Sequence, residues 1–304
     1  MNTCGINKSI IKLLLPIFLL LFIKQESRAQ LNPLGGIYFQ NQYQANPAMA
    51  GLEDRLNLNL SMRQQWNSIP GAPKTQSITA DYGFSNKVGL GLNIYNDQAG
   101  LQKQTRIMGT YAYHLPVGSD SQQLSFGVSF GFMNDRLNTE DMKGDTSPDV
   151  IVGRYNQRET FFDGDFGIAY TGKRLTIQGA LPNMKSIFSK DQNNSVADRS
   201  IFYSAISYKI VNEESLNGFI VEPKICYRGV KGYDNIADIG TYLGFAGNAL
   251  NLMAMYHTTQ SATFGAGINY KKTLAIMGMY NTETAALSGY TNGTFEINLR
   301  VSLF

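Results

Sequence analysis

Apolar residues recur at every second position through most of the chain. In the first such segment Leu56, Leu58, Leu60 and Met62 alternate with polar residues. A period of two places alternate side chains on opposite faces of a β-strand. Thirteen further segments of strand length share this alternation and are bounded by turn residues, namely 78–84, 88–94, 107–113, 124–132, 162–170, 175–181, 202–210, 219–227, 239–245, 250–256, 264–270, 274–280 and 295–303. The pattern therefore predicts an all-β fold of about fourteen strands.

The arrangement of these segments favours a transmembrane antiparallel β-barrel. An even strand number with short turns, such as 85–87 and 271–272, fits a meander that closes on itself in an outer membrane. Tyrosines and phenylalanines at strand ends favour interface girdles over ordinary β-propensity. A soluble sandwich of this length would usually divide into domains. The polar residues predicted to face the lumen are Gln76, Thr79, Asp81, Asn93, Arg106, Ser125, Ser129, Asp163, Asp165, Gln178, Asn269, Glu296, Asn298 and Arg300.

The N-terminus has the pattern of a secretory signal. Lys8 and Lys12 precede an apolar run at 13–23, and a polar stretch follows that ends at Ala29. Eleven apolar residues are too few to span a bilayer, so an uncleaved anchor is disfavoured. We predict that residues 1–29 are removed, that 30–55 form an N-terminal extension that is periplasmic or plug-like, and that 56–304 form the outer-membrane barrel.

Charge and cysteine content exclude several classes of function. The signal carries four basic residues and one acidic residue, so the totals of 26 basic and 23 acidic fall to 22 of each. A neutral chain without a basic stripe predicts no nucleic-acid partner. Cys226 is the only cysteine outside the signal, which excludes an internal disulfide and a cysteine metal cluster. We expect it to be buried or lipid-facing, and we expect no cofactor.

Nothing in the sequence predicts an enzyme. The two histidines, His114 and His257, each follow a tyrosine at a strand end, and we interpret them as interface or loop residues. There is no Gly-x-Ser-x-Gly motif and no metal-spaced histidine pair. A solvated loop is favoured over a calcium site for an acidic group whose spacing does not match an EF-hand, namely Asp135, Glu140, Asp141, Asp145 and Asp149.

Two short segments do not follow the strand pattern. The first contains the run Asn-Pro-Ala-Met-Ala-Gly at 46–51, and the second contains Arg-Gln-Gln-Trp at 63–66 followed by Pro-Gly-Ala-Pro-Lys-Thr-Gln at 70–76. The prolines prevent regular ladder pairing, so each segment is either a tight structural turn or a docking element. The candidate contact residues are Asn46, Pro47, Ala48, Gly51, Arg63, Gln65, Trp66, Pro70, Gly71, Pro73, Lys74 and Gln76.

With these two motifs and the strands that follow, residues 30–304 resemble the PorP/SprF family of type IX secretion system membrane proteins of the Bacteroidetes. The resemblance implies an outer-membrane barrel that serves protein export and gliding motility. It implies three partners: an exported surface adhesin or its C-terminal region, periplasmic secretion-system proteins, and outer-membrane lipid. It supplies no catalytic residue.

The leading hypothesis from the sequence is therefore a non-catalytic protein that binds or anchors an exported adhesin. In this hypothesis the polar lumen captures an extended peptide, and the N-terminal segment contacts periplasmic machinery. The alternative is an outer-membrane channel or porin-like transporter, because fourteen strands enclose a pore if nothing fills it.

Overall fold

The computed structural model describes residues 34–66, 71–118, 122–137, 160–185, 200–212, 218–230, 234–284, 289 and 291–303. Among them, strand segments join in one antiparallel sheet. No helix in this part of the chain is long and apolar enough to cross a membrane. The strands are β1 (Leu56–Gln65), β2 (Lys74–Ser85), β3 (Val88–Ala99), β4 (Gln102–Pro116), β5 (Gln123–Leu137), β6 (Phe161–Thr171), β7 (Leu175–Leu181), β8 (Ser200–Tyr208), β9 (Ile210–Asn212), β10 (Phe219–Val230), β11 (Ile236–Phe245), β12 (Leu250–His257), β13 (Ser261–Tyr270), β14 (Leu274–Asn281) and β15 (Thr294–Leu303).

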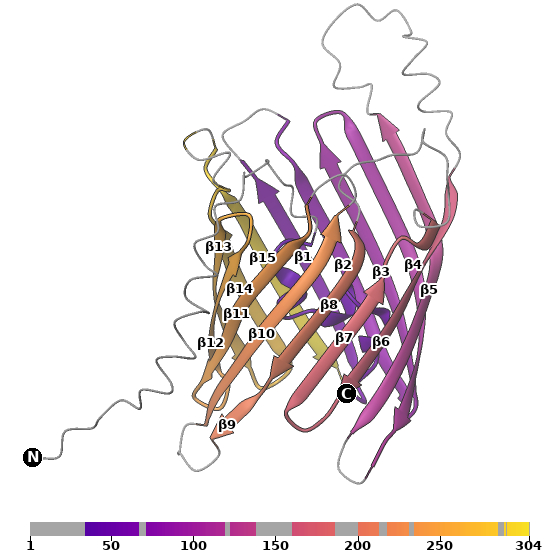
Figure 1. The fold of residues 1–304 in the computed structure, drawn as a ribbon, viewed down its shortest axis with the longest axis vertical. Coiled ribbons are helices and arrows are strands. Elements are labelled where there is room, and N and C mark those ends of the chain that lie inside the picture. Colours follow the sequence, from indigo (N-terminus) through magenta and orange to yellow (C-terminus); the bar gives the residue numbers. More distant parts are fainter. Residues whose placement is uncertain are drawn as a thin grey trace, which may run out of the picture.

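The sheet closes into a barrel (Figure 1). Apart from β8 and β9, each strand pairs with the next along the chain, and β15 pairs with β1. The segments β8 and β9 both pair with β10, one after the other, so they occupy a single place in the wall and the barrel has 14 strands. The all-β barrel of fourteen strands is thus confirmed, and each of the fourteen predicted segments lies in the wall.

The two faces of the wall differ in polarity as the alternation predicts. The outer face carries exposed apolar side chains such as Leu60 and Ile107, whereas the inner face carries buried polar ones such as Asn59 and Ser129. The prediction for Gln76 was wrong, because its side chain is exposed on the outer face. Gln76 lies on the same face of β2 as Ile78, and the prediction followed its polarity instead of its position in the alternation.

The ends of the barrel are distinguished by their connections. The connections of eight or more residues, which follow β1, β5, β7 and β14, all lie at one end of the barrel, together with short turns after β3 and β12. The connections at the other end, where β1 begins and β15 finishes, are shorter, as after β2, β6, β11 and β13. Barrels of this class direct short turns to the periplasm, so we name this the periplasmic end and the opposite one the outer end. Exposed aromatic rings gather near both, as interface girdles do. Those near the periplasmic end include Tyr82, Phe84, Tyr113, Tyr208 and Tyr270, and those near the outer end include Phe132, Phe162, Tyr256, Tyr280 and Phe295.

Residues 34–51, here called the plug, lie inside the barrel (Figure 1). They form three short 3-10 turns, η1 (Ile37–Phe39), η2 (Gln42–Gln44) and η3 (Pro47–Met49). Pro47 starts the last turn, where its fixed φ suits a helical residue and its missing N–H leaves no donor unpaired. The described part of the N-terminal extension is therefore plug-like, which is one of the two arrangements that we predicted.

Candidate functional site: the plug and its lumen contacts

The first half of the plug, residues 34–40, lies in the outer half of the lumen. The backbone N–H of Gly36 donates to both carboxylate oxygens of Glu296, at 3.0 and 2.9 Å. Glu296 is opposite Arg63, near the outer ends of β15 and β1. Side chains of η1 pack in one buried cluster with four methionines of β12 and β14, namely Met253, Met255, Met277 and Met279.

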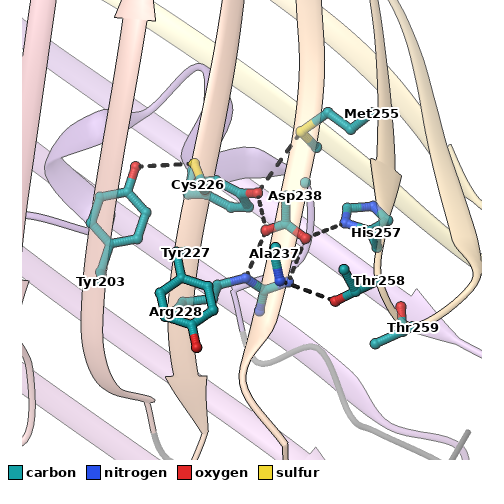
Figure 2. Close-up of polar contacts among 12 residues, drawn as sticks. Tyr203, Cys226, Tyr227, Arg228, Ala237, Asp238, Met255, His257, Thr258 and Thr259 are labelled. Carbon is teal, nitrogen blue, oxygen red and sulfur yellow. Dashed lines mark hydrogen bonds and ion pairs between the residues drawn. The ribbon is translucent and has the colours of Figure 1, made fainter. Parts of the chain in front are cut away.

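A buried polar network contacts this half of the plug. It consists of Tyr38, Arg228, Asp238, His257 and Thr263 and is here called the latch cluster. Asp238 accepts hydrogen bonds from the Tyr38 hydroxyl at 2.6 Å, Arg228 Nε at 2.8 Å and His257 Nδ1 at 2.6 Å. His257 Nε2 lies 2.8 Å from Thr263 Oγ1. Figure 2 shows Asp238 between Arg228 and His257. Burial raises the pKa of the Tyr38 hydroxyl well above its usual value, so that it remains a donor.

The latch cluster corrects our interpretation of the histidines. His257 is 1% exposed and His114 is 2% exposed, and both face the lumen, not the interface or a loop. Strand alternation explains the error, because Tyr113 and Tyr256 point outward and the next residue must point inward. Cys226 is buried, as one of its two predicted placements required.

The second half of the plug, residues 43–51, packs directly against the backbone of strands β2–β6. A Cβ atom on Gly127 would lie 2.2 Å from the carbonyl carbon of Pro47, and one on Gly89 would lie 2.0 Å from the carbonyl oxygen of Ala50. Gly167 approaches the Asn46 side chain in the same way. Real Cβ contacts are never this short, so the plug occupies space that only glycine leaves open. Glycine inside a strand often marks such an approach, and this signal was present in the sequence.

Asn46 connects the plug to the wall. Its Oδ1 accepts from the backbone N–H of Ala48 at 3.0 Å, which caps η3. Its Nδ2 donates to the carbonyl oxygen of Ile168 at 3.1 Å and to Gln178 Oε1 at 3.4 Å. The predicted contact residues Asn46, Pro47 and Ala48 therefore contact the barrel itself, fully buried.

Gly51 makes the turn from the plug into the first strand. Its φ is +66°, a conformation that favours glycine, and its N–H donates to Asp81 Oδ2 at 3.1 Å. His114 contacts Ala50, the residue before Gly51, since its Nε2 lies 3.0 Å from the carbonyl oxygen of Ala50. Its Nδ1 lies 2.8 Å from Ser125 Oγ. These contacts lie close to the periplasmic end.

The second motif lies at the outer end, around the connection between β1 and β2. The side chains of Arg63 and Gln65 are buried on the lumen side of the wall, and Arg63 Nη2 donates to Gln65 Oε1 at 3.3 Å. Trp66 leaves the strand with a φ of +47°, and its N–H donates to the carbonyl oxygen of Gly293 at 2.9 Å. Lys74 is exposed, as is Gln76.

The other candidate residues in this connection are Pro70, Gly71 and Pro73. Gly71 has a φ of +74°, and its carbonyl oxygen accepts from the N–H of Gly100 at 2.9 Å. Pro73 accepts from the N–H of Gln65 at 3.0 Å. Pro70 lies outside the described residues.

The structure does not bring the two motifs into one site. Asp81 accepts a hydrogen bond from Gly51, and Thr75 is opposite Arg63; these two residues are six positions apart on β2. At about 3.3 Å per residue, that is roughly 20 Å along the strand. One motif therefore belongs to the plug and the other to the outer rim.

The described residues include no group of three or more His, Cys, Asp or Glu side chains placed to hold a metal ion. Most of the acidic loop that we considered for calcium, from Glu140 to Asp149, lies outside the described residues. The predicted signal at 1–29 lies outside them as well.

Residues 27–301 match the family described as type IX secretion system membrane protein PorP/SprF. The chain belongs to the PorP/SprF family. It is thus an outer-membrane β-barrel of the type IX secretion system, and its family implies interaction with other components of that system. No curated protein sequence matches it.

Solved structures with similar folds have little sequence identity with this PorP/SprF chain. The Acinetobacter baumannii outer membrane protein Omp33 is 11% identical with a TM-score of 0.47, covering 83% of this chain and 99% of that one. A mutant of the Rh. blastica porin is 10% identical with a TM-score of 0.34, covering 82% and 99%. CdiB from Acinetobacter baumannii is 8% identical with a TM-score of 0.40, covering 83% and 60%. The fold assignment rests on the strand pairing within this chain.

Proposed function

We propose that this PorP/SprF protein is a non-catalytic anchor that holds an exported surface adhesin at the outer end of its barrel. The observation that carries the proposal is that the plug closes the lumen. The plug contacts both β2–β6 and β8–β15, and Tyr38, Asn46 and Ala48 are each 0% exposed. A channel of this strand number needs an open interior, and the plug occupies it.

The lumen is also less available to a peptide than the sequence suggested. Asp81 and Glu296 accept hydrogen bonds from the plug backbone, and Gln178 donates to Gln42. Because these polar groups already have partners, we place the anchoring surface at the outer rim. Trp66, Lys74 and Gln76 lie there, beside the turn that Gly71 makes.

A photo-cross-linking residue placed at position 74 in cells tests this assignment. We expect it to capture a large exported surface protein, which mass spectrometry would identify. The matched control is position 87, which is exposed in the turn at the other end of the same strand. Capture of the surface protein from position 87 and not from position 74 would contradict the proposal.

The channel alternative has its own test. Purified protein in a planar bilayer should give no stepwise ion conductance while the plug is seated. Stable single-channel currents from the intact protein would favour a porin-like transporter and count against a purely anchoring role.

A further inference from the structure

The lumen is not filled at its periplasmic end. A cavity of about 450 Å³, here called the vestibule, lies beneath the plug residues 40–43. Its wall includes Asn57 and Asn59 of β1, and its rim includes the β6–β7 turn and the junction between β8 and β9. Because these connections lie at the periplasmic end, the plug separates the vestibule from the cell surface.

Three cationic side chains lie at the rim of the vestibule. Lys173 and Arg174 form the β6–β7 turn, and the N–H of Lys209 donates to the carbonyl oxygen of Arg174 at 2.7 Å. All three side chains are exposed, and none has an ion pair among the described residues. A fourth cation, Arg300, is already engaged, because its Nη2 lies 3.2 Å from Glu53 Oε2.

The remaining polar groups of the vestibule leave the rim cationic. Asp81 accepts from the N–H of Gly51 and from Asn57 Nδ2, so its charge is already shared. Glu53 is paired with Arg55 and Arg300, so Glu222 is the third carboxylate of the lining, against three rim cations that have no ion pair among the described residues. The exposed side chains of Lys173, Arg174 and Lys209 are therefore placed to bind a ligand that carries carboxylates.

We propose that the vestibule binds an acidic, extended peptide segment of a periplasmic component of the secretion system. An acidic peptide fits because the cations lie at the mouth and polar side chains such as Asn59 and Thr176 line the cavity. The occupant is periplasmic because the plug closes the route from the outer end. The proposal deepens the function proposed above, since it names where and by what chemistry periplasmic machinery meets this barrel.

The test measures binding of fluorescein-labelled hexaglutamate to the purified full chain in detergent by fluorescence anisotropy. Replacing Lys173→Gln, Arg174→Gln and Lys209→Gln together should weaken binding about tenfold, because each exposed charge contributes modestly. Added salt should weaken binding to the unchanged protein. The matched control is Lys271→Gln with Lys272→Gln, which removes two exposed cations from another turn at the same end and should leave binding unchanged.

Equal binding of hexalysine, equal binding by the triple variant, or an equal loss in the control would each overturn the proposal. The assay is independent of the adhesin. Peptide binding at the vestibule without capture of a surface protein at position 74 would therefore contradict the anchoring function and support the vestibule. Capture at position 74 without peptide binding would do the reverse.

Discussion

The two halves of the plug are held in the barrel by different means. The outer half is held by polar side chains, since Tyr38 and Gly36 bond to Asp238 and Glu296 on distant strands. The inner half, residues 43–51, also has polar contacts with the wall, but in addition its backbone packs directly against glycines such as Gly89 and Gly127. Removing atoms should therefore release the outer half, whereas adding atoms should displace the inner half. The difference indicates that loosening of the plug would begin at the outer end, near the proposed anchoring rim.

The largest effect is expected from filling the space that the inner half needs. Gly127→Leu places side-chain atoms where Pro47 and Ala48 lie, so the plug cannot seat. Overpacking that neighbouring side chains can absorb costs about 1–3 kcal/mol, but here the new atoms overlap the plug backbone, so we expect the whole inner half to be displaced. We expect stepwise conductance in planar bilayers, which the unchanged protein should not show, together with protease cleavage within residues 34–51.

Gly109→Leu is the control for this experiment. Gly109 lies on the outer face of β4, and its nearest neighbour for a new Cβ is the carbonyl oxygen of Phe130 at 3.9 Å. This variant should remain closed. If both variants conduct, the current reports general damage to the wall and not loss of the plug.

The next largest effect concerns the latch cluster. Asp238→Asn keeps the shape of the side chain but leaves Arg228 buried without its carboxylate. Breaking a buried ion pair by removing one partner typically costs about 3–5 kcal/mol in the free energy of unfolding. Denaturant titration of the protein in lipid vesicles, followed by the fluorescence of Trp66, measures this change. Glu53→Gln removes the weaker, solvent-accessible pairs with Arg55 and Arg300 and should cost at most about 1 kcal/mol. Equal losses in the two variants would show that burial of the latch cluster does not affect stability.

A local effect is expected from Tyr38→Phe. This change removes one hydroxyl that donates to a carboxylate, which typically costs about 1.5–3 kcal/mol. Amide hydrogen exchange should rise for residues 36–41 and remain slow for residues 46–51, because the inner half keeps its backbone contacts. Uniform exchange along the whole plug would show that the two halves release together.

The strands could be predicted because alternation alone determines which residues share a face, and that signal is local. Gln76 and the two histidines were misplaced for a common reason, since we judged them by residue type and not by register. The position of the plug could not be predicted in this way. Its turns have no repeating pattern, and its bonds join residues up to 260 positions apart, as Gly36 and Glu296 show. Glycines at inward register, including Gly89 and Gly127, were the available sign of a close backbone approach.

The smallest effect separates the two roles of Asn46, which lies where the glycine contacts begin. Asn46→Ser keeps an oxygen that can cap η3 but loses the donation to the carbonyl oxygen of Ile168, so it should cost about 1 kcal/mol. Asn46→Ala also loses the cap and should cost roughly 1 kcal/mol more. Unfolding titrations of the two variants give the difference directly. If serine and alanine cost the same, the cap contributes nothing, and the inner half is held by its glycine contacts and its bonds to the wall alone.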